Sequence, residues 1–403
     1  MTPPPDSSTA SIAIPASEHN KEFDTAKVAV IAGAHGIHDT YQAFLPALLP
    51  VLIQKFSLIK TEAGLLSVFV TVPSLLQPFI GYLADRAPLR YFVIFTPAVT
   101  AVLMSLIGVA PSYILVALLL FVVGISSASL HATGPVLAGR LSANRLGLGM
   151  SFWMVGGELG RTFGPIIIVT VISNFSIEAT PWLAVVGILT SVLLFFQFRG
   201  LIEHRAEAQL ALPWRKALAV MRPVLIPISA ILLTRAFAYV SVATYLPTFL
   251  TDEGANLMLA GASLSVMEAA GVAGAFLAGS LSDRFGRRPA LGFSLTMTSV
   301  FIALLLLGRG WVQFPILLGL GFSLLSLTPV TMAIVQESFP ENRALANGIF
   351  MAVSFVSSSF ATLVVGAVGD LYNLRTAYII SAVLVLVGLP FILKLPRKNN
   401  LTR

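Results

Sequence analysis

Long apolar runs dominate this sequence. Twelve runs of about 20 residues follow one another along nearly all of the 403-residue chain, and each is long enough to cross a hydrocarbon core of about 30 Å as a helix. Transmembrane β-strands are only about ten residues long and alternate in polarity, so these runs indicate helices. Only 11% of the residues are charged and the mean hydropathy is +0.88, whereas soluble domains carry about a quarter charged residues. The sequence therefore predicts an all-α membrane protein.

The runs fall into two sets of six, with a more polar stretch between them. The predicted spans are 27–53, 61–84, 91–110, 112–138, 147–172 and 181–198, then 224–250, 258–281, 289–308, 312–337, 345–369 and 376–395. We expect two six-helix bundles at 27–198 and 224–395, a linker at 199–223, and cytoplasmic tails at 1–26 and 396–403. The first tail is polar and lacks the apolar core of a signal peptide, so we expect it to be disordered.

The positive charges are unevenly distributed. The net charge is +7, but if the first tail is cytoplasmic, 19 of the 25 Lys and Arg lie on cytoplasmic segments or span ends, four lie outside and two lie within spans. This positive-inside bias predicts that both termini are cytoplasmic in a cell (inner) membrane, and it makes the lipid bilayer, not nucleic acid, the expected partner. The chain has no cysteine, which excludes disulfides and thiolate metal sites.

A short charged loop occurs twice. Gly81–Arg90 and Gly279–Arg288 both contain Gly-x-Leu-x-Asp-Arg between two apolar runs, at an offset of 198 residues. In the first and seventh predicted spans, Phe44-Leu45-Pro46 resembles Tyr245-Leu246-Pro247. A repeat at half the chain length indicates two copies of one folding unit, and an even number of spans in each copy makes the halves parallel.

These features resemble the major facilitator superfamily over residues 27–395. Within it, three stretches resemble the fosmidomycin-resistance branch, namely His35–Pro46, Gly156–Pro165 and Gln336–Pro340. The fourth span departs from that branch, which tends to have His-Pro followed by Glu where this chain has His131-Ala132-Thr133-Gly134-Pro135. The resemblance implies twelve helices in the major facilitator fold and proton-driven drug export. In this superfamily the Gly-x-x-x-Gly-Pro pattern of Gly160–Pro165 is associated with exchangers.

We therefore expect a secondary active transporter working by alternating access. The expected activity is proton-coupled efflux of a small anionic, zwitterionic or amphipathic solute such as a drug, by a monomer without a cofactor. Import by proton symport is the closest rival, because the same carboxylates would serve it. A membrane-embedded enzyme is a more distant alternative, since the chain has no Gly-x-x-x-x-Gly-Lys-Ser/Thr, His-Glu-x-x-His or Gly-x-Ser-x-Gly pattern.

Five charged residues inside the predicted spans are not duplicated between the halves. They are Asp39, Glu158, Arg161, Arg235 and Glu268. A charge at the centre of a membrane helix costs about 2.5–3.5 kcal/mol on insertion scales, so five of them require a reason. One reason is structural: Glu158 with Arg161, and Arg235 with Glu268, would only neutralise each other. The functional alternative is that all five face a wet central cavity and bind a charged solute.

Proton-coupling residues are expected on the first span. His35, His38, Asp39 and Gln42 follow three- and four-residue spacing and share one helix face. Asp39 is the predicted proton carrier, with His35 or His38 as its partner. Glu158 and Glu268 are further candidates, and His38 has the alternative of bonding a backbone carbonyl. A metal site built from the first-span histidines, Asp39 and His131 is a weaker alternative without diagnostic ligand spacing, so no metal is predicted.

Substrate and gating residues follow from charge and from the repeat. A guanidinium fork matches a carboxylate or phosphonate, so the predicted substrate-binding residues are Arg161, Arg235, His131, Gln42, Tyr41 and Tyr239. The resemblance implies that the duplicated loop is a latch that holds the cytoplasmic side shut in one state. Its predicted gating residues are Gly81, Asp85, Arg86, Arg90, Gly279, Asp283, Arg284, Arg287 and Arg288.

Overall fold

The described part of the chain is built from helices and contains no strand. A computed structural model describes residues 23–77, 79–80, 89–143, 145–200, 214–339 and 343–395. The first half contains α1 (Thr25–Gln42), α2 (Phe44–Phe56), α3 (Lys60–Thr71), the 3-10 helix η1 (Val72–Leu76), α5 (Leu89–Leu106), η2 (Ile107–Val109), α6 (Tyr113–Leu141), α7 (Leu146–Asn174), η3 (Ile177–Leu183) and α8 (Ala184–Phe198). The second half contains α9 (Trp214–Ala243), α10 (Leu246–Asp252), α11 (Leu257–Phe285), α12 (Arg287–Leu307), η4 (Gly310–Val312), α13 (Gln313–Ser338), α14 (Arg343–Leu371), α15 (Leu374–Val387) and α16 (Leu389–Ile392).

Ten helical segments within the described residues are long and apolar enough to cross a membrane. The two remaining predicted crossings are interrupted helices, α1 with α2 and α3 with η1. Together they agree with the prediction of a twelve-helix membrane protein. Most boundaries differ from the prediction by a few residues, and the seventh span differs most. Its helix begins at Trp214 instead of 224, and the basic residues Arg215 and Lys216 of the predicted linker form its first turn.

The first and seventh crossings are broken at equivalent places. α1 ends at Gln42 and α2 restarts with Phe44-Leu45-Pro46, while α9 ends at Ala243 and α10 restarts with Leu246-Pro247. Proline has no N–H to donate and its ring clashes with the carbonyl one turn earlier, so a helix breaks most readily just before it. The similar tripeptides of the two halves therefore produce matching breaks.

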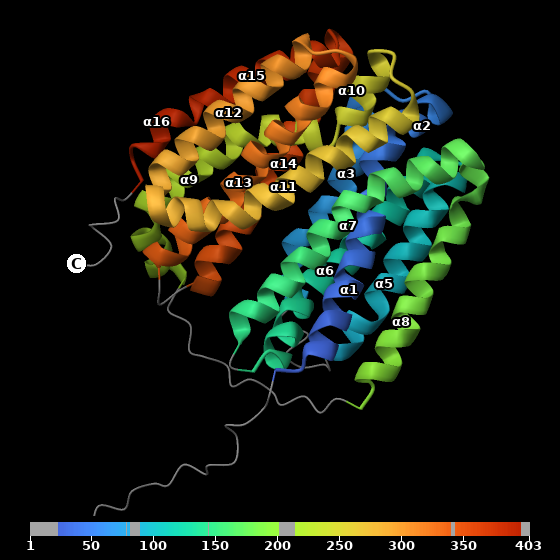
Figure 1. Cartoon of the computed structure of the whole chain (residues 1–403), viewed down its shortest axis with the longest axis horizontal. Coiled ribbons are helices and arrows are strands. Elements are labelled where there is room, and N and C mark those ends of the chain that lie inside the picture. Colours follow the sequence, from blue (N-terminus) through green and yellow to red (C-terminus); the bar gives the residue numbers. More distant parts are fainter. Residues whose placement is uncertain are drawn as a thin grey trace, which may run out of the picture.

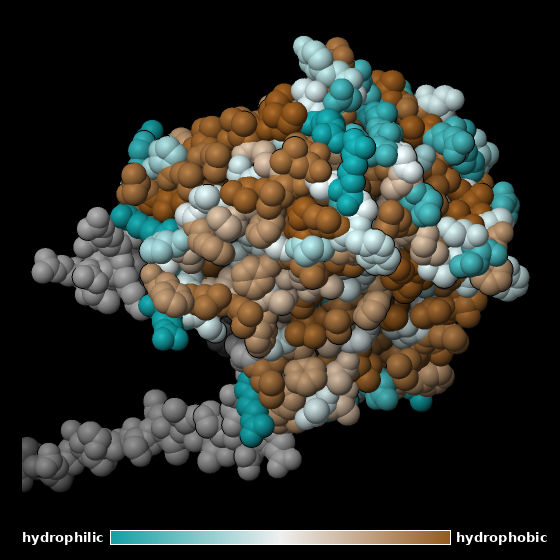
Figure 2. Space-filling view, turned by 45° about the horizontal axis from the view of Figure 1, so that its top comes forward, coloured by the Kyte–Doolittle hydropathy of each residue, from teal (hydrophilic) through white to brown (hydrophobic). Residues whose placement is uncertain are grey.

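Each half buries its own apolar core. The second half is built around one cluster of buried side chains, and the first half contains two clusters, one near Leu48 and one near Ile94. Many large apolar side chains stay exposed, among them Phe79, Ile114 and Phe276. Figure 2 shows apolar side chains over most of the visible face, with hydrophilic side chains gathered mainly toward its edges. An apolar exterior of this kind suits contact with lipid.

The two halves lie side by side and meet most closely at one end (Figure 1). We call this contact the clamp, formed by Lys60, Thr61, Tyr245, Asp252 and Asp370. The carboxylate of Asp370, on α14, accepts hydrogen bonds from the backbone nitrogens of Lys60 (2.5 Å) and Thr61 (2.9 Å), the first two residues of α3. The Lys60 ammonium lies 3.3 Å from the carboxylate of Asp252. Asp370 thus caps the N-terminus of a helix in the other half, where negative charge is favourable.

Buried packing reinforces the clamp. The side chain of Tyr245 is completely buried, and its hydroxyl lies 3.1 Å from the carbonyl oxygen of Lys60 in the first half and 3.0 Å from that of Thr362 in the second. The short helices that follow the two proline breaks, α2 and α10, pack against each other at the same end, and α3 packs against α14. The clamp therefore holds the two halves together at the end opposite the first turns of α1 and α9.

Candidate functional site

A row of glycines on α7 lets this helix lie directly against α1. A Cβ atom added at Gly156 would lie 2.1 Å from the carbonyl oxygen of Ala32, and one added at Gly160 would lie 2.1 Å from that of Gly36. Between them, a Cβ at Gly157 would lie 2.4 Å from the His35 ring. Only a residue without a side chain permits this approach. The glycine row therefore places the middle of α7 against the ionisable face of α1.

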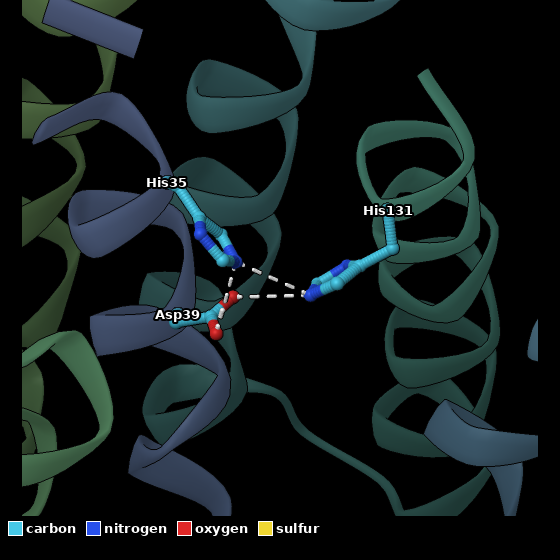
Figure 3. Close-up of side chains that lie close together, drawn as sticks. All are labelled: His35, Asp39 and His131. Atoms are coloured by element: carbon cyan, nitrogen blue, oxygen red, sulfur yellow. Dashed lines mark hydrogen bonds and ion pairs between the residues drawn. The ribbon is translucent and has the colours of Figure 1, made fainter. Parts of the chain in front are cut away.

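His35, Asp39 and His131 form a compact cluster midway along the helices, which we call the histidine–aspartate cluster (Figure 3). His35 Nε2 lies 3.4 Å from Asp39 Oδ2, His131 Nε2 lies 3.8 Å from Asp39 Oδ1, and the two Nε2 atoms are 3.3 Å apart. The His35 ring stacks on Trp153 of α7 with ring centroids 3.7 Å apart. Asp39 is 7% exposed at its side chain and His131 is 33% exposed, so the cluster is reached from the His131 side.

The tautomers of both imidazoles follow from their backbone partners. His35 Nδ1 lies 2.8 Å from the carbonyl oxygen of Trp153, and His131 Nδ1 lies 2.9 Å from the carbonyl oxygen of Ser127. A carbonyl oxygen only accepts hydrogen bonds, so each Nδ1 carries a hydrogen and donates it. When both rings are neutral, their Nε2 lone pairs face each other and the Asp39 carboxylate. Three electron-pair donors then converge with no proton between them, and this arrangement is repulsive unless a cation joins it.

His38 lies outside this cluster. Its ring is fully buried, and its Nε2 accepts a hydrogen bond of 2.7 Å from the side-chain nitrogen of Gln42. The same Gln42 nitrogen lies 2.7 Å from the hydroxyl oxygen of Ser127 on α6. Of the two predicted partners of Asp39, the structure places His35 at its carboxylate and gives His38 a hydrogen bond elsewhere. The amide nitrogen of Gln42, a predicted substrate contact, is likewise engaged by protein groups.

A second cluster joins the two halves near the middle of α7 and α11. We call it the charged triad, and it consists of Glu158, Arg161 and Glu268. Arg161 donates a short hydrogen bond to Glu158, one turn away on α7, and its Nε lies 3.7 Å from the carboxylate of Glu268 on α11 of the second half. The Arg161 side chain is 35% exposed, whereas those of Glu158 and Glu268 are 12% and 8% exposed. Two carboxylates therefore share one guanidinium at the contact between the halves. The pairing of Glu268 with Arg235, which belonged to the structural alternative, does not occur, because Glu268 lies beside Arg161.

Arg235 forms no ion pair within the described part of the chain. One of its terminal nitrogens donates to the carbonyl oxygen of Leu324 (3.2 Å) and to the hydroxyl of Thr328 (3.0 Å), both on α13. Its guanidinium carbon lies 5.0 Å from the centroid of the Tyr239 ring, a cation–π contact. Its Nε is buried without a hydrogen-bond partner. Arg235 thus carries a positive charge that no neighbouring carboxylate compensates.

Tyr41 lies away from the charged groups. Its side chain is buried in the core of the first half, edge-on to Phe44, and its hydroxyl donates a hydrogen bond of 2.5 Å to the carbonyl oxygen of Leu183 in η3. This placement ties α1 to its own bundle and leaves no surface for a solute. The predicted contact between Tyr41 and substrate does not fit this environment.

The duplicated charged loop is described only in part. Gly81, Asp85 and Arg86 lie outside the described residues, and the Arg90 guanidinium lies 5.1 Å from the ring centroid of its neighbour Tyr91. In the second copy, Arg287 lies 2.6 Å from Asp283 and 2.6 Å from Glu337 at the end of α13. This copy therefore ties α11, α12 and α13 together within the second half.

The other members of the second copy have separate contacts. Arg288 donates to the carbonyl oxygen of Leu395 beyond α16, and Arg284 lies over the ring of Phe285. At Gly279, no atom of another helix in the described part of the chain lies within 4 Å of a Cβ built there. The close approach of α11 to α13 occurs earlier, at Gly274, where a Cβ would lie 2.3 Å from the carbonyl oxygen of Phe322.

The clamp was not anticipated from the sequence. Lys60 is one of the four basic residues outside the positive-inside pattern, and no role was predicted for Asp252 or Asp370. Their one sequence signal is their position, since all three lie at span ends on the same predicted side of the membrane. Their position does not reveal which of these residues contact each other, because the contacting residues are about 190 to 310 residues apart in the chain.

Comparison with known proteins identifies the family. The model of the Major Facilitator Superfamily matches residues 31–308 and, in a second match, residues 265–402. The chain is 25% identical over 369 residues to the fosmidomycin resistance protein of Escherichia coli (strain K12), covering 89% of this chain and 90% of that protein. It is also 25% identical over 374 residues to the MFS-type transporter YfnC of Bacillus subtilis (strain 168), with the same coverage.

Solved structures agree on the fold. A bacterial homolog of the human lysosomal transporter Spinster, in an inward-facing and unoccupied conformation, superposes with a TM-score of 0.77 at 14% identity, covering 93% of this chain and 97% of that chain. A D-xylose–proton symporter superposes with a TM-score of 0.72 at 16% identity, covering 92% and 97%.

The fold and the family match define an integral membrane transporter for small molecules, not an enzyme. The chain belongs to the Major Facilitator Superfamily. Within it, the chain is similar to the fosmidomycin resistance protein, in agreement with the resemblance seen in the motifs.

Proposed function

We propose that the protein is a proton-coupled exporter of a small anionic, zwitterionic or amphipathic solute, acting as a monomer by alternating access. The observation that carries this proposal is the placement of two ionisable clusters near the middle of the predicted membrane-crossing helices, one inside the first half and one on the contact between the halves. Ionisable groups at this depth are costly and are typically retained for transport or for proton relay. The export of a drug-like solute is supported by the similarity to the fosmidomycin resistance protein.

The clamp fits one end state of an alternating-access cycle. It joins the halves at the end that holds the first turn of α3 and the last turn of α14. If the termini are cytoplasmic, as the positive-inside pattern predicts, the clamp closes the outer side, as an inward-facing state requires. Export then requires the clamp to release while the opposite ends of the halves close around the solute.

The histidine–aspartate cluster is the proposed proton site. Its three converging electron-pair donors require a cation, and a proton placed on either Nε2 creates an imidazolium that faces Asp39. Asp39, the proposed carrier, and His35 Nε2 then share this proton, and the partly exposed His131 gives access to the cluster. One proton moving down 100 mV releases about 2.3 kcal/mol, enough to sustain roughly a 50-fold solute gradient.

The substrate site is proposed to lie between the two halves. Arg235 has no carboxylate partner among the described residues, and Tyr239 covers the face of its guanidinium, so an anionic group of the solute would complete this environment. Arg161 is the second cation, but Glu158 and Glu268 compensate it. Protonation of Glu158 or Glu268 would free Arg161 for the solute and loosen the contact between α7 and α11. The charged triad thus offers a way to connect proton uptake to movement of the halves.

The test is proton movement in proteoliposomes. Wild type and Asp39→Asn are reconstituted with a pH-sensitive dye inside, and fosmidomycin and tetracycline are added as probe solutes. We expect a solute-triggered pH change with wild type that Asp39→Asn abolishes. Tyr41→Phe, which changes a hydroxyl buried in the core, is the matched control and should retain proton movement once its folding is verified. Solute transport by wild type without any pH change would contradict the proposal.

A further inference from the structure

The histidine–aspartate cluster has the features of a metal site as well as those of a proton site. Metal-binding histidines almost always donate their second ring N–H to a backbone carbonyl or a carboxylate, which fixes the tautomer and aims the other nitrogen at the metal. Both imidazoles do this here, since His35 Nδ1 is held by the carbonyl of Trp153 and His131 Nδ1 by that of Ser127. Each bare Nε2 therefore already points at the same space as the carboxylate.

The spacing of the donor atoms matches a coordination sphere. Zn²⁺ binds imidazole nitrogen and carboxylate oxygen at about 2.0–2.1 Å, so neighbouring ligands of a tetrahedral ion lie about 3.3 Å apart. The distances here are 3.3 Å between the two Nε2 atoms, 3.4 Å from His35 Nε2 to Asp39 Oδ2, and 3.8 Å from His131 Nε2 to Asp39 Oδ1. Asp39 is only 5% exposed, and its Oδ1 atom is buried without a hydrogen-bond partner among the described residues.

We propose that His35, Asp39 and His131 bind a divalent transition-metal ion of the Zn²⁺ class. Two imidazoles and one carboxylate suit such ions, whereas Mg²⁺ and Ca²⁺ prefer oxygen ligands. The partly exposed His131 would leave one side of the ion open for a water molecule or a ligand of the solute. The sequence ranked this possibility below a proton site for want of ligand spacing, because two ligands come from α1 and the third comes from α6.

The electrostatic surroundings permit a cation here. The nearest fixed positive charge named above, Arg161, is compensated by Glu158 on its own helix and by Glu268 across the contact between the halves. Asp39 supplies one negative charge to the ion, and the ring of Trp153 covers His35 and limits access of water on that side. The inference goes beyond the proposed function, because it depends on donor geometry and requires no transport. A metal ion and a proton would exclude each other from this cluster.

The experiment measures metal binding to the whole purified protein in detergent. The chain has five histidines and no cysteine, so His19 and His204 are first replaced by Gln to remove competing imidazoles. Co²⁺ is the spectroscopic probe, because low-coordinate Co²⁺ with nitrogen ligands shows intense visible absorption, and Zn²⁺ is then titrated in competition. We expect one Co²⁺ per chain with such bands, displacement by Zn²⁺, and no displacement by Mg²⁺.

Ligand variants separate this site from adventitious binding. His35→Gln and His131→Gln, on different helices, should each abolish the bands and weaken Zn²⁺ binding by more than about tenfold, since even second-shell changes cost about 10–100-fold. His38→Gln, four residues from Gln42 on α1, is the matched control and should bind as the parent does. Thermal unfolding verifies that each variant is folded. The proposal is overturned if the parent binds no stoichiometric Co²⁺, or if both ligand variants bind like His38→Gln. Metal binding without proton movement would refute only the proposed function.

Discussion

Replacing Gly160 with Ala tests whether the glycine row on α7 positions the site. A Cβ atom at residue 160 would lie 2.1 Å from the carbonyl oxygen of Gly36, 2.9 Å from its carbonyl carbon and 2.9 Å from the backbone nitrogen of Thr40. All three atoms belong to the backbone of α1, so no side chain can rotate away. Because carbon atoms do not approach others much below 3 Å, α1 and α7 would have to separate by about 1 Å in a tightly packed interior.

The magnitude follows from overpacking. Extra methyl groups forced into a well-packed core cost about 1–3 kcal/mol, which offsets the gain of about 1 kcal/mol that alanine brings to a helix over glycine. Gly279→Ala is the matched control, because it makes the same change in α11 where no atom lies within 4 Å of the new Cβ. Here only the helix propensity changes, so the control should leave stability unchanged or raise it. The two substitutions are therefore expected to act in opposite directions.

The assay is thermal unfolding in detergent, followed by solute-triggered proton movement in liposomes. Gly160→Ala should lower the melting temperature by a few degrees and reduce proton movement, because the displaced α7 no longer holds Trp153 against His35. Gly279→Ala should match or exceed wild type in melting temperature. If Gly160→Ala is as stable and as active as Gly279→Ala, the glycine row does not set the distance between α1 and α7, and the geometry of the histidine–aspartate cluster does not depend on it.

Three further outcomes are expected. Glu268→Gln should lower the melting temperature less than Arg161→Gln, since losing Arg161 leaves two buried carboxylates facing each other at a cost of about 3–5 kcal/mol; the reverse order would contradict the triad. Asp370→Ala should lower the free energy needed to open the clamp by about 1–3 kcal/mol. A cysteine placed at Thr248, which is buried in α10, should then react faster with a thiol reagent, and equal labelling rates would argue against the clamp. Hydrogen bonds from Arg375 lower the pKa of Glu253 below its ordinary value of 4.5. Wild type should therefore be more stable than Glu253→Gln at neutral pH, and this difference in stability should vanish as the pH falls below the lowered pKa.

The fold was predictable because its signals are local. Runs of apolar residues define most of the crossings, and the duplicated loop and the similar tripeptides ending in Pro46 and Pro247 reveal the two halves. The helix starts were less accurate, as at Trp214, because a basic first turn such as that of α9 is compatible with either helix or linker. The breaks in the first and seventh crossings were not predicted, because prolines such as Pro97 and Pro165 lie inside continuous helices, so a proline alone does not tell where a helix ends.

The site was predictable only as a set of candidates. Residues on one helix face, such as His35 and Asp39, or one turn apart, such as Glu158 and Arg161, were grouped correctly by spacing. Partners on other helices were not, so the structural alternative paired Glu268 with Arg235, although Glu268 lies beside Arg161. The choice between His35 and His38 also needed the structure, because both are one turn or less from Asp39 and only packing decides which ring points at it.

The most direct test of proton-coupled export is solute uptake driven by an imposed pH gradient. Liposomes containing wild type or Asp39→Asn are prepared with an acidic or an alkaline interior, and uptake of radiolabelled fosmidomycin is followed against protein-free liposomes. Proton antiport predicts uptake into vesicles with an acidic interior, because outward proton flow drives the solute inward, and it predicts that Asp39→Asn loses this uptake. Uptake only into vesicles with an alkaline interior would indicate symport, and transport independent of the gradient would contradict proton coupling altogether.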